Sequence, residues 1–555
     1  MGRSPRKDLL AGLTVAIVAL PLALGFGISS GAGAQAGLVT AVIAGAVAAV
    51  CGGSNLQVTG PTGAMTVVLV PIVHRYGTNG VITVGLLAGA ILVALALARA
   101  GRWMAYVPVP VVEGFTLGIA AVIGLQQIPN ALGVKAPAGD NPAVVAAKAA
   151  ADFATHPHWA ATAIAVTVVA AMLLGARLRP GVPFSLVAVV GATVVAQAAQ
   201  LHVATIGHLP AGIPAPSLGF FETGHVPALL PSALAVAALA ALESLMSASA
   251  ADAMSVSERH DSDRELFGQG LANLAAPLFG GVAATGAIAR TAVNVRSGAV
   301  SRLSALVHAA VLAVIVFAAA PLVADIPLAA LAGVLIATAV RMVEVGSLRA
   351  LARSGRGETL VMALTAIVTL ASTLVNAVIA GLVLAGVLAL RQVARAARLE
   401  QVPLHADLPP ADHHEEEQRL LAEHIVAYRL DGPLLFAAAH RFLLELTAAA
   451  DVRVVILRMS RVSAIDASGA KVLGDAITRL TRRGTLVLVS GVREDHRTCL
   501  DALGVLDELH ATGRTFATTP QALAFAHAHL YGTGLIPAPA AVPPLERGSA
   551  GYVDV

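Results

Sequence analysis

The chain has 555 residues, of which 57% are hydrophobic and only 12% are charged, and its mean hydropathy is +0.79. Soluble domains carry about 25% charged residues, so this composition excludes a soluble globular enzyme and a disordered chain. Two cysteines exclude a disulfide framework, and a net charge of +3 gives no reason to expect nucleic-acid binding. No Cys/His spacing resembles a zinc site, so neither a metal nor another cofactor is expected.

Long apolar runs predict a polytopic membrane domain. From Leu9 to His74 there is no Asp, Glu, Lys or Arg, which is enough for about three spans of ~20 residues. Similar runs, separated by Gly, Pro or charge, continue to Ala394. The fourteen predicted spans are Asp8–Ser29, Gln35–Cys51, Pro61–Val73, Gly80–Ala98, Val107–Gln127, Trp159–Gly175, Phe184–Leu201, Leu230–Ala250, Glu265–Gly280, Gly286–Val300, Leu303–Leu322, Ile326–Arg341, Glu358–Leu374 and Asn376–Ala394.

The distribution of positive charge predicts the orientation. If the N-terminus is cytoplasmic, the even-numbered connections should be rich in Lys and Arg. Those connections carry Arg99 and Arg102, Arg177 and Arg179, and further arginines up to Arg356, whereas the opposite connections carry few. We therefore expect both termini on the cytoplasmic side of the plasma (inner) membrane.

Two of the predicted spans are too short to cross a bilayer. The segment Pro61–Val73 follows Gly52-Gly53 and Gly60, and the segment Gly286–Val300 follows Gly280-Gly281. The two breaks lie about 225 residues apart, and corresponding interrupted helices in two halves are typical of transporters with internal repeats. The two repeats cover about residues 8–203 and 229–396. Because each repeat has seven spans, an odd number, the second repeat is inverted in the membrane relative to the first.

Broken helices in a membrane expose backbone N–H groups and the positive end of the helix dipole, so a facing pair of them favours an anion site. The simpler alternative is that Gly and Pro only kink two packed helices. The candidate binding residues at the two breaks are Thr62, Gly63 and Ala64, and Gly286, Ala287 and Ile288.

Three side chains near these breaks are candidates for chemistry. Arg290 lies about one turn into the second broken helix, where an arginine needs a partner or an anion. Glu243 is the only acid between Val226 and Ala251, and Ser247 follows it on the same helix face. A buried carboxylate can take up a proton near neutral pH, or it can ligate Na⁺ together with hydroxyl groups. The alternatives are structural roles for Arg290 and Glu243, which include their pairing.

Other polar residues in the spans are weaker candidates. Glu113 is expected at the membrane interface, in contact with solvent. His74 and His308 could relay protons, although a lone histidine in a span is more often structural. Packing roles are expected for Asn294 and Asn376.

The composition changes near residue 400, after the membrane domain of residues 1–398. Residues 399–419 are expected as a linker, 420–531 as a small cytoplasmic α/β domain, and 532–555 as a disordered tail. The expected strands of the α/β domain are His424–Leu430, Val452–Met459 and Leu486–Val489. Its expected helices are Ala438–Ala449, Ser468–Thr481 and Arg493–Ala502. Ser468 is either the N-cap of its helix, which is the simpler interpretation, or a phosphorylation site.

These motifs, taken in order, resemble the SulP (sulfate permease) anion transporters over about residues 8–530. The resemblance rests on Leu20–Phe26, on the Gly60–Thr66 motif and on the segment Gly286–Asn294. The segment Asp466-Ala467-Ser468-Gly469 is similar to their C-terminal STAS domain. The resemblance implies two inverted repeats divided into core and gate domains, an elevator-like motion and a homodimer. It also implies that Phe26 lines the anion site and that Glu243 takes the place of the acid that serves cation coupling.

The sequence therefore leads to the hypothesis of a proton-coupled symporter, not an enzyme, for sulfate, bicarbonate or a dicarboxylate such as fumarate. Sodium-coupled bicarbonate members carry Asp at the position of Glu243 and a hydroxyl residue at the position of Ile288, which favours H⁺ here. A Na⁺-coupled bicarbonate symporter and an uncoupled anion exchanger or channel remain alternatives. A cytoplasmic regulator acting on the STAS domain is a possible partner.

Overall fold

The structure is a computed structural model. It describes residues 4–535, apart from 103–106, 138, 140, 179–182, 209, 211, 222, 256–258, 319, 373, 397, 403–422 and 436–451. The chain divides into two compact units, residues 1–385 and 386–555, which are described here one at a time.

Helices make up most of the first unit, and each of the fourteen predicted spans falls on one of them. The matching helices are α1 (Pro5–Ser29), α2 (Ala34–Cys51), α3 (Gly63–Leu97), α4 (Val109–Leu132), α6 (Trp159–Leu178), α7 (Phe184–Ala198), α8 (Val226–Met254), α9 (Ser262–Leu278), α10 (Ile288–Arg296), α11 (Leu303–Ala318), α13 (Leu328–Met342), α15 (Arg356–Ala371) and α16 (Leu374–Ala396). Among the described residues, seven helices are long and apolar enough to cross a membrane, and α6, α7 and α11 are shorter apolar helices. The chain is therefore a multi-pass membrane protein.

Helix α3 contains two of the predicted spans. Its 35 residues are interrupted at Gly77, where φ is +67° and the backbone leaves the helical region. A left-handed conformation is readily adopted by glycine, so Gly77 allows the chain to turn between the two spans. The sequence did not predict four further short helices: α5 (Pro142–Thr155), the 3₁₀ helix η2 (Thr223–His225), α12 (Ala320–Ala324) and α14 (Val345–Ser354).

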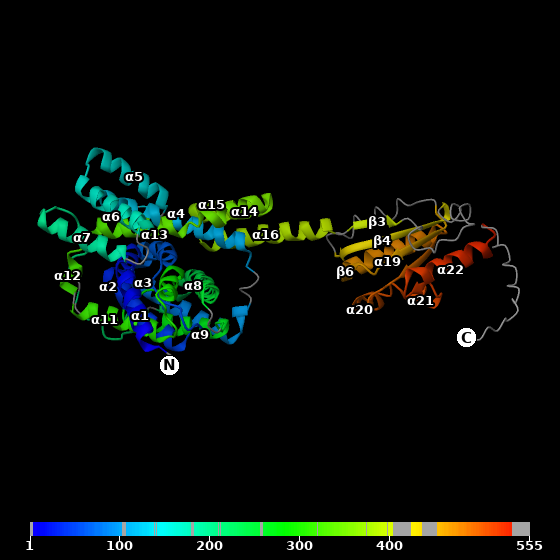
Figure 1. The fold of residues 1–555 in the computed structure, drawn as a ribbon, viewed down its shortest axis with the longest axis horizontal. Coiled ribbons are helices and arrows are strands. Elements are labelled where there is room, and N and C mark those ends of the chain that lie inside the picture. Colours follow the sequence, from blue (N-terminus) through cyan, green and yellow to red (C-terminus); the bar gives the residue numbers. More distant parts are fainter. Residues whose placement is uncertain are drawn as a thin grey trace, which may run out of the picture. The chain divides into compact units, whose positions relative to one another are not determined.

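The helices of the first unit form two groups, and each group mixes helices from both halves of the sequence (Figure 1). In the core group, α1, α2 and α3 pack against α8, α9, α10 and α11. In the gate group, α4 packs against α13 and α15, and α6 packs against α7 and α13. Such interleaving of the two halves is the arrangement expected of inverted repeats.

Small residues bring the core helices into close contact. A Cβ atom on Gly37 of α2 would lie 2.0 Å from the carbonyl oxygen of Ala23 in α1. A Cβ atom on Gly53 would lie 2.0 Å from the carbonyl oxygen of Asp261, just before α9. Only glycine fits at these two positions, which is how membrane helices approach closely without a hydrophobic driving force between them.

The second unit contains a six-stranded sheet. Its strands are β3 (Arg398–Val402), β4 (Ile425–Leu434), β5 (Val454–Arg458), β6 (Val462–Ile465), β7 (Leu486–Ser490) and β8 (Thr515–Phe516). The order is β3-β4-β5-β7-β8, with β6 paired to β4, and every pair except β3–β4 is parallel. Strand β3 lies partly within the segment 399–419 that was expected as linker.

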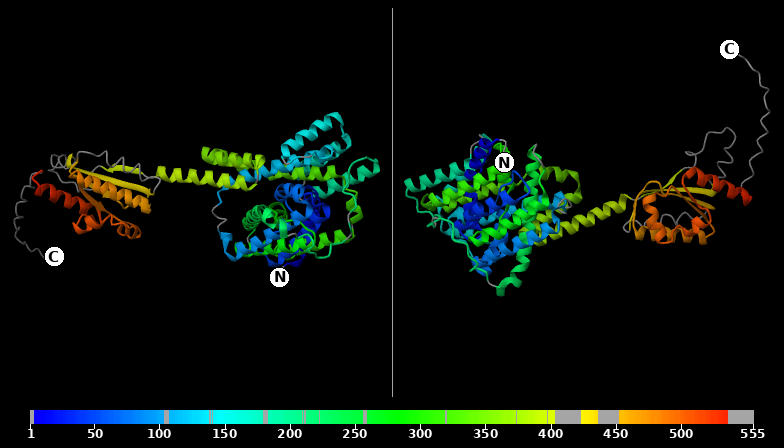
Figure 2. Two further views of the ribbon diagram at one scale, coloured as in Figure 1. Left: turned by 180° about the vertical axis from the view of Figure 1, so that it is seen from behind. Right: turned by 90° about the horizontal axis from the view of Figure 1, so that it is seen from below.

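Helices cover both faces of this sheet (Figure 2). They are α19 (Ala467–Arg482), α20 (Glu494–Ala502), α21 (Asp507–Ala511) and α22 (Thr519–Gly532). Alternate residues of β5 point to opposite faces: Val455 packs in the cluster with α19, and Val454 packs in the cluster with α22. The expected helix Ala438–Ala449 lies outside the described residues.

The N-cap expected at Ser468 is wrong. The capping residue of α19 is Asp466, whose side chain accepts a hydrogen bond of 2.7 Å from the N–H of Gly469. Ser468 is the second residue of the helix and is exposed, because the capping residue lies two residues earlier than the sequence suggested.

Candidate anion-binding site

The two broken helices meet through a two-stranded antiparallel sheet. Strand β1 (Thr59–Gly60) pairs with β2 (Thr285–Gly286), with Thr59 opposite Gly286 and Gly60 opposite Thr285. Each strand leads directly into a helix, so the N-termini of α3 and α10 are held close together although they are about 225 residues apart in the sequence. The pairing of β1 with β2 therefore brings the two predicted helix breaks side by side.

Both helix ends present backbone N–H groups. The N-cap residues are Thr62 before α3 and Ala287 before α10, and neither side chain bonds to the first turn of its own helix. The first N–H groups of a helix have no partner within it. The N–H groups that begin with Gly63 and Ala64 on one side, and with Ile288 on the other, are thus placed to bind an anion.

Glu243 joins this site from α8. Its Oε2 accepts a hydrogen bond of 2.9 Å from the hydroxyl of Thr62, and its side chain is partly buried. The next residue, Ser244, is fully buried and its hydroxyl accepts from the N–H of Gly286 at 3.0 Å. Helix α8 therefore contacts the break before α3 through one side chain and the break before α10 through the next.

Arg290 of α10 bonds to the segment that precedes α3 and so links the two broken helices. It is 1% exposed, and its Nη2 donates to the carbonyl oxygen of Pro61 at 2.6 Å. Gly60 makes this possible, because a Cβ atom there would lie 2.4 Å from Nη1 of Arg290. Arg290 bonds to Pro61 and Glu243 bonds to Thr62, so the site contains a buried cation and a partly buried carboxylate that are held by different partners.

Ser247 has a structural role beside the site. Its hydroxyl is fully buried and shares a hydrogen bond of 2.9 Å with the hydroxyl of Thr291 in α10. The same Thr291 hydroxyl accepts from the N–H of Val58 at 3.1 Å. The structure thus places Ser247 against α10, one turn away from Glu243.

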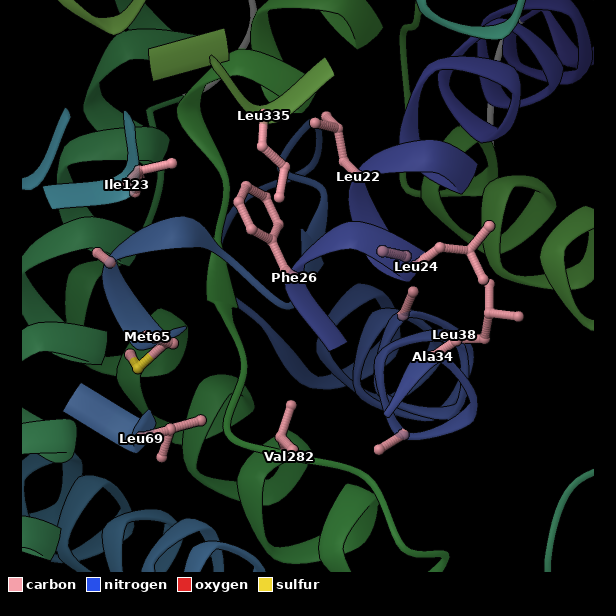
Figure 3. Packing of buried hydrophobic residues seen from close by; sticks show 14 of the residues in the cluster. Leu22, Leu24, Phe26, Ala34, Leu38, Met65, Leu69, Ile123, Val282 and Leu335 are labelled. Atoms are coloured by element: carbon pink, nitrogen blue, oxygen red, sulfur yellow. The ribbon is translucent and has the colours of Figure 1, made fainter. Parts of the chain in front are cut away.

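Phe26 lies in the apolar wall of the site. It is 6% exposed and belongs to the same buried cluster as Ala64, Ile123 and Leu335. Figure 3 shows its ring directed toward Leu335 of the gate helix α13. Ile288, by contrast, is 40% exposed at the start of α10, while Gly286 and Ala287 behind it are buried.

Sequence reasoning missed Gln57, Ser244 and Thr285. Gln57 is 6% exposed, and neither polar atom of its amide has a hydrogen-bond partner among the described residues. A Cβ atom on Gly286 would lie 1.7 Å from Nε2 of Gln57, so residue 286 must be glycine for this amide to fit. The hydroxyl of Thr285 shares a hydrogen bond of 2.9 Å with Ser244. The only available signal was their position next to the two breaks.

Two further candidates have structural partners. Oε1 of Glu113 accepts from the hydroxyl of Ser347 at 2.6 Å, at the start of α4 and away from the site. Nδ2 of Asn294 donates to the carbonyl oxygen of Leu56 and to Ser304. Across the residues for which the structure gives positions, no three His, Cys, Asp or Glu side chains gather as metal ligands.

Comparisons with known proteins identify relatives of both units. The Sulfate permease family model matches residues 6–365 and the STAS domain model matches residues 420–522. The putative sulfate transporter YvdB of Bacillus subtilis is 34% identical over 519 residues, 91% of this chain and 94% of that protein. The bicarbonate transporter BicA of Synechocystis is 31% identical over 522 residues, 91% of each chain.

Solved structures of anion transporters are also similar to this chain. The transmembrane domain of a cyanobacterial bicarbonate transporter BicA has a TM-score of 0.62 and 32% identity, covering 69% of this chain and 98% of that one. Murine Slc26a9, described as an anion transporter, has a TM-score of 0.82 over 94% of this chain and 91% of its own. At 16% identity, this second likeness shows the shared fold alone.

Proposed function

The chain belongs to the sulfate permease family, and we propose that it is a secondary transporter of a small anion such as sulfate, bicarbonate or a dicarboxylate. The observation that carries this proposal is the meeting of the α3 and α10 N-termini at the β1–β2 pair. Two helix dipoles and two sets of free N–H groups bind an anion without requiring a fixed cation at its surface.

The substrate classes are supported by the relatives. YvdB is named a putative sulfate transporter and BicA a bicarbonate transporter, and both match about nine-tenths of this chain. Backbone N–H groups bind oxyanions of different shapes, so the site itself does not choose between them. Fumarate is included because the family resemblance implies dicarboxylates among the substrates.

We propose that Glu243 carries the proton of an H⁺-coupled symport. Its carboxylate bonds directly to the N-cap of α3, so its charge state bears on the same helix end that binds the anion. Protonation would remove one negative charge as one anion enters. The side chain at position 288 is an isoleucine, which offers no oxygen ligand for Na⁺, and this favours H⁺.

The test is uptake of labelled sulfate, bicarbonate and fumarate into proteoliposomes. Each anion is measured under an inward H⁺ gradient and, separately, under an inward Na⁺ gradient. Glu243→Gln removes the titratable group while keeping its size. Glu113→Gln is the matched control, since Glu113 is a carboxylate of the same domain that bonds to Ser347 outside the site.

We expect H⁺-driven uptake of one anion, its loss in Glu243→Gln and its retention in Glu113→Gln. Uptake driven only by Na⁺ would replace H⁺ coupling by Na⁺ coupling. Uptake that ignores both gradients would make the protein an exchanger or a channel, with a structural role for Glu243. No uptake of any of the three anions would refute the proposed substrate classes.

The charge pattern and the family resemblance support a proposal for the orientation and the assembly. We propose that both termini are cytoplasmic, that the core helices move against the gate helices in an elevator-like step, and that the protein is a homodimer. Ser468, exposed at the start of α19, stays a candidate for regulation by phosphorylation or by a cytoplasmic partner.

A further inference from the structure

Polar side chains of α10 and α11 meet behind the anion site. Arg290 and Asn294 are four residues apart on α10, and Ser304 and His308 are four apart on α11, so each pair lies on one helix face. Asn294 donates from Nδ2 to the hydroxyl of Ser304 at 2.9 Å. Arg290 and His308 each lie one helical turn from that contact, on the two helices that make it.

Three of these side chains have buried polar atoms without a protein partner. His308 is 0% exposed, and neither of its ring nitrogens is hydrogen-bonded to a described residue. The same is true of Nη1 of Arg290, at 1% exposure, and of Oδ1 of Asn294, at 0%. Buried polar groups are almost always satisfied, and a buried water is the usual partner where protein atoms are not.

The donor and acceptor types of these unpaired atoms would allow one water to bond to all three side chains. Nη1 of Arg290 is a donor, Oδ1 of Asn294 is an acceptor, and a neutral imidazole offers one lone pair and one N–H. A water that accepts from Arg290 and donates to Asn294 and His308 makes about three hydrogen bonds, the usual number for a buried water. A neutral histidine also adds no positive charge beside the arginine.

We propose that a buried water bridges Arg290, Asn294 and His308, and that His308 thereby acts as a positioning residue for Arg290. The bond from Nη2 to Pro61 fixes one end of the guanidinium. The water fixes Nη1, so that the positive charge is held at the α3 and α10 helix ends. The functional part of this inference rests on the proposed anion transport, whereas the water itself does not.

The experiment compares three variants in the full-length protein. His308→Leu removes the hydrogen-bonding ring but keeps an apolar side chain. His308→Gln restores a donor and an acceptor. Leu312→Met is the matched control, because Leu312 is also 0% exposed and lies one turn further along α11, and a methionine conserves its volume. Uptake kinetics and the melting temperature of each variant are measured with the anion that the wild type transports.

We expect His308→Leu to raise the KM for the anion about tenfold with a nearly unchanged maximal rate, as for the loss of one hydrogen bond to a charged group. We expect His308→Gln and Leu312→Met to stay within about twofold of the wild type. An unchanged KM in His308→Leu would overturn the positioning role, and so would an equal loss in His308→Gln.

A second measurement does not depend on transport. A high-resolution cryo-electron microscopy map of the wild type should contain density for a water within hydrogen-bond distance of Nη1 of Arg290 and of the His308 ring. A well-resolved map without it would refute the bridge. If the wild type transports no anion, the proposed function fails while this density still tests the water. If His308→Leu does not fold, the map and the kinetics of His308→Gln decide.

Discussion

Replacing Gly63 by alanine tests how tightly the core and gate helices meet at the anion site. A Cβ atom on Gly63 of α3 would lie 2.2 Å from Cδ1 of Ile123 in α4 and 3.0 Å from the ring of Phe26. Ile123 is 2% exposed, so its side chain has little room to move. The backbone N–H of residue 63 is retained in the variant, so the change is purely one of shape.

Overpacking of this kind costs about 1–3 kcal/mol. If that cost falls on the state in which α3 and α4 are in contact, the population of that state falls roughly 5- to 150-fold, since 1.4 kcal/mol is a factor of ten. We therefore expect Gly63→Ala to slow anion uptake into proteoliposomes by about that factor. The expected loss is in maximal rate.

The atom that would clash, Cδ1 of Ile123, can be removed by a second substitution. Ile123→Val deletes Cδ1, so the double variant Gly63→Ala with Ile123→Val should recover most of the lost rate. Gly124→Ala is the control, because a Cβ atom on this neighbouring residue of α4 meets nothing within 4 Å. Wild-type uptake by Gly63→Ala would refute the steric argument. If the double variant folds but its uptake rate does not recover, the loss of rate arises at the N-terminus of α3 and not from the contact with Ile123.

Three further predictions concern stability, measured on the full chain. Glu265→Gln should lower the melting temperature, at a cost of about 1–3 kcal/mol, because both carboxylate oxygens of Glu265 accept hydrogen bonds, Oε2 from the N–H groups of Gly53 and Ser54 and Oε1 from Gln269, whereas an amide has only one oxygen; an unchanged melting temperature would contradict this. Asp466→Ala should weaken hydrogen-exchange protection in the first turn of α19 by about 1 kcal/mol, whereas Ser468→Ala should not; equal effects would contradict the assigned cap. Gly77→Ala should also lower the melting temperature, by about 1–2 kcal/mol, since φ there is +67°; a stabilised variant would show that the kink relaxes to helix.

Hydropathy and glycine placement were sufficient to predict most of the membrane domain. The broken helices were expected from Pro61 and Gly286, and they begin at Gly63 and Ile288. The helix α5 was missed because it is not a long apolar run. The STAS strands β4, β5 and β7 were predicted because each begins with a run of apolar, mostly β-branched or leucine residues, whereas β8 has only two residues.

The contacts within the site were harder to predict. Gln57, Ser244 and Thr285 are ordinary polar residues, and their roles depend on pairings such as Gln57 with Gly286, which are more than 200 residues apart. The cap of α19 was misassigned because Asp466 and Ser468 are both good capping residues and only the helix start distinguishes them. Local sequence gives residue type, but tertiary packing decides the partner.

The short β1–β2 pair has an evolutionary consequence. Three buried threonines hold the pair. Thr59 accepts from the side-chain amide of Gln269, Thr285 donates to a backbone carbonyl of α8, and Thr291 accepts from a backbone N–H beside β1. Ile288 and Ala289, which begin α10 two residues after β2, are exposed and have no side-chain group that could hydrogen-bond to the buried threonines. Under the proposed function, substitutions at these two positions would change the surface that meets the anion and leave the buried scaffold intact, so substrate preference is free to diverge without loss of the fold.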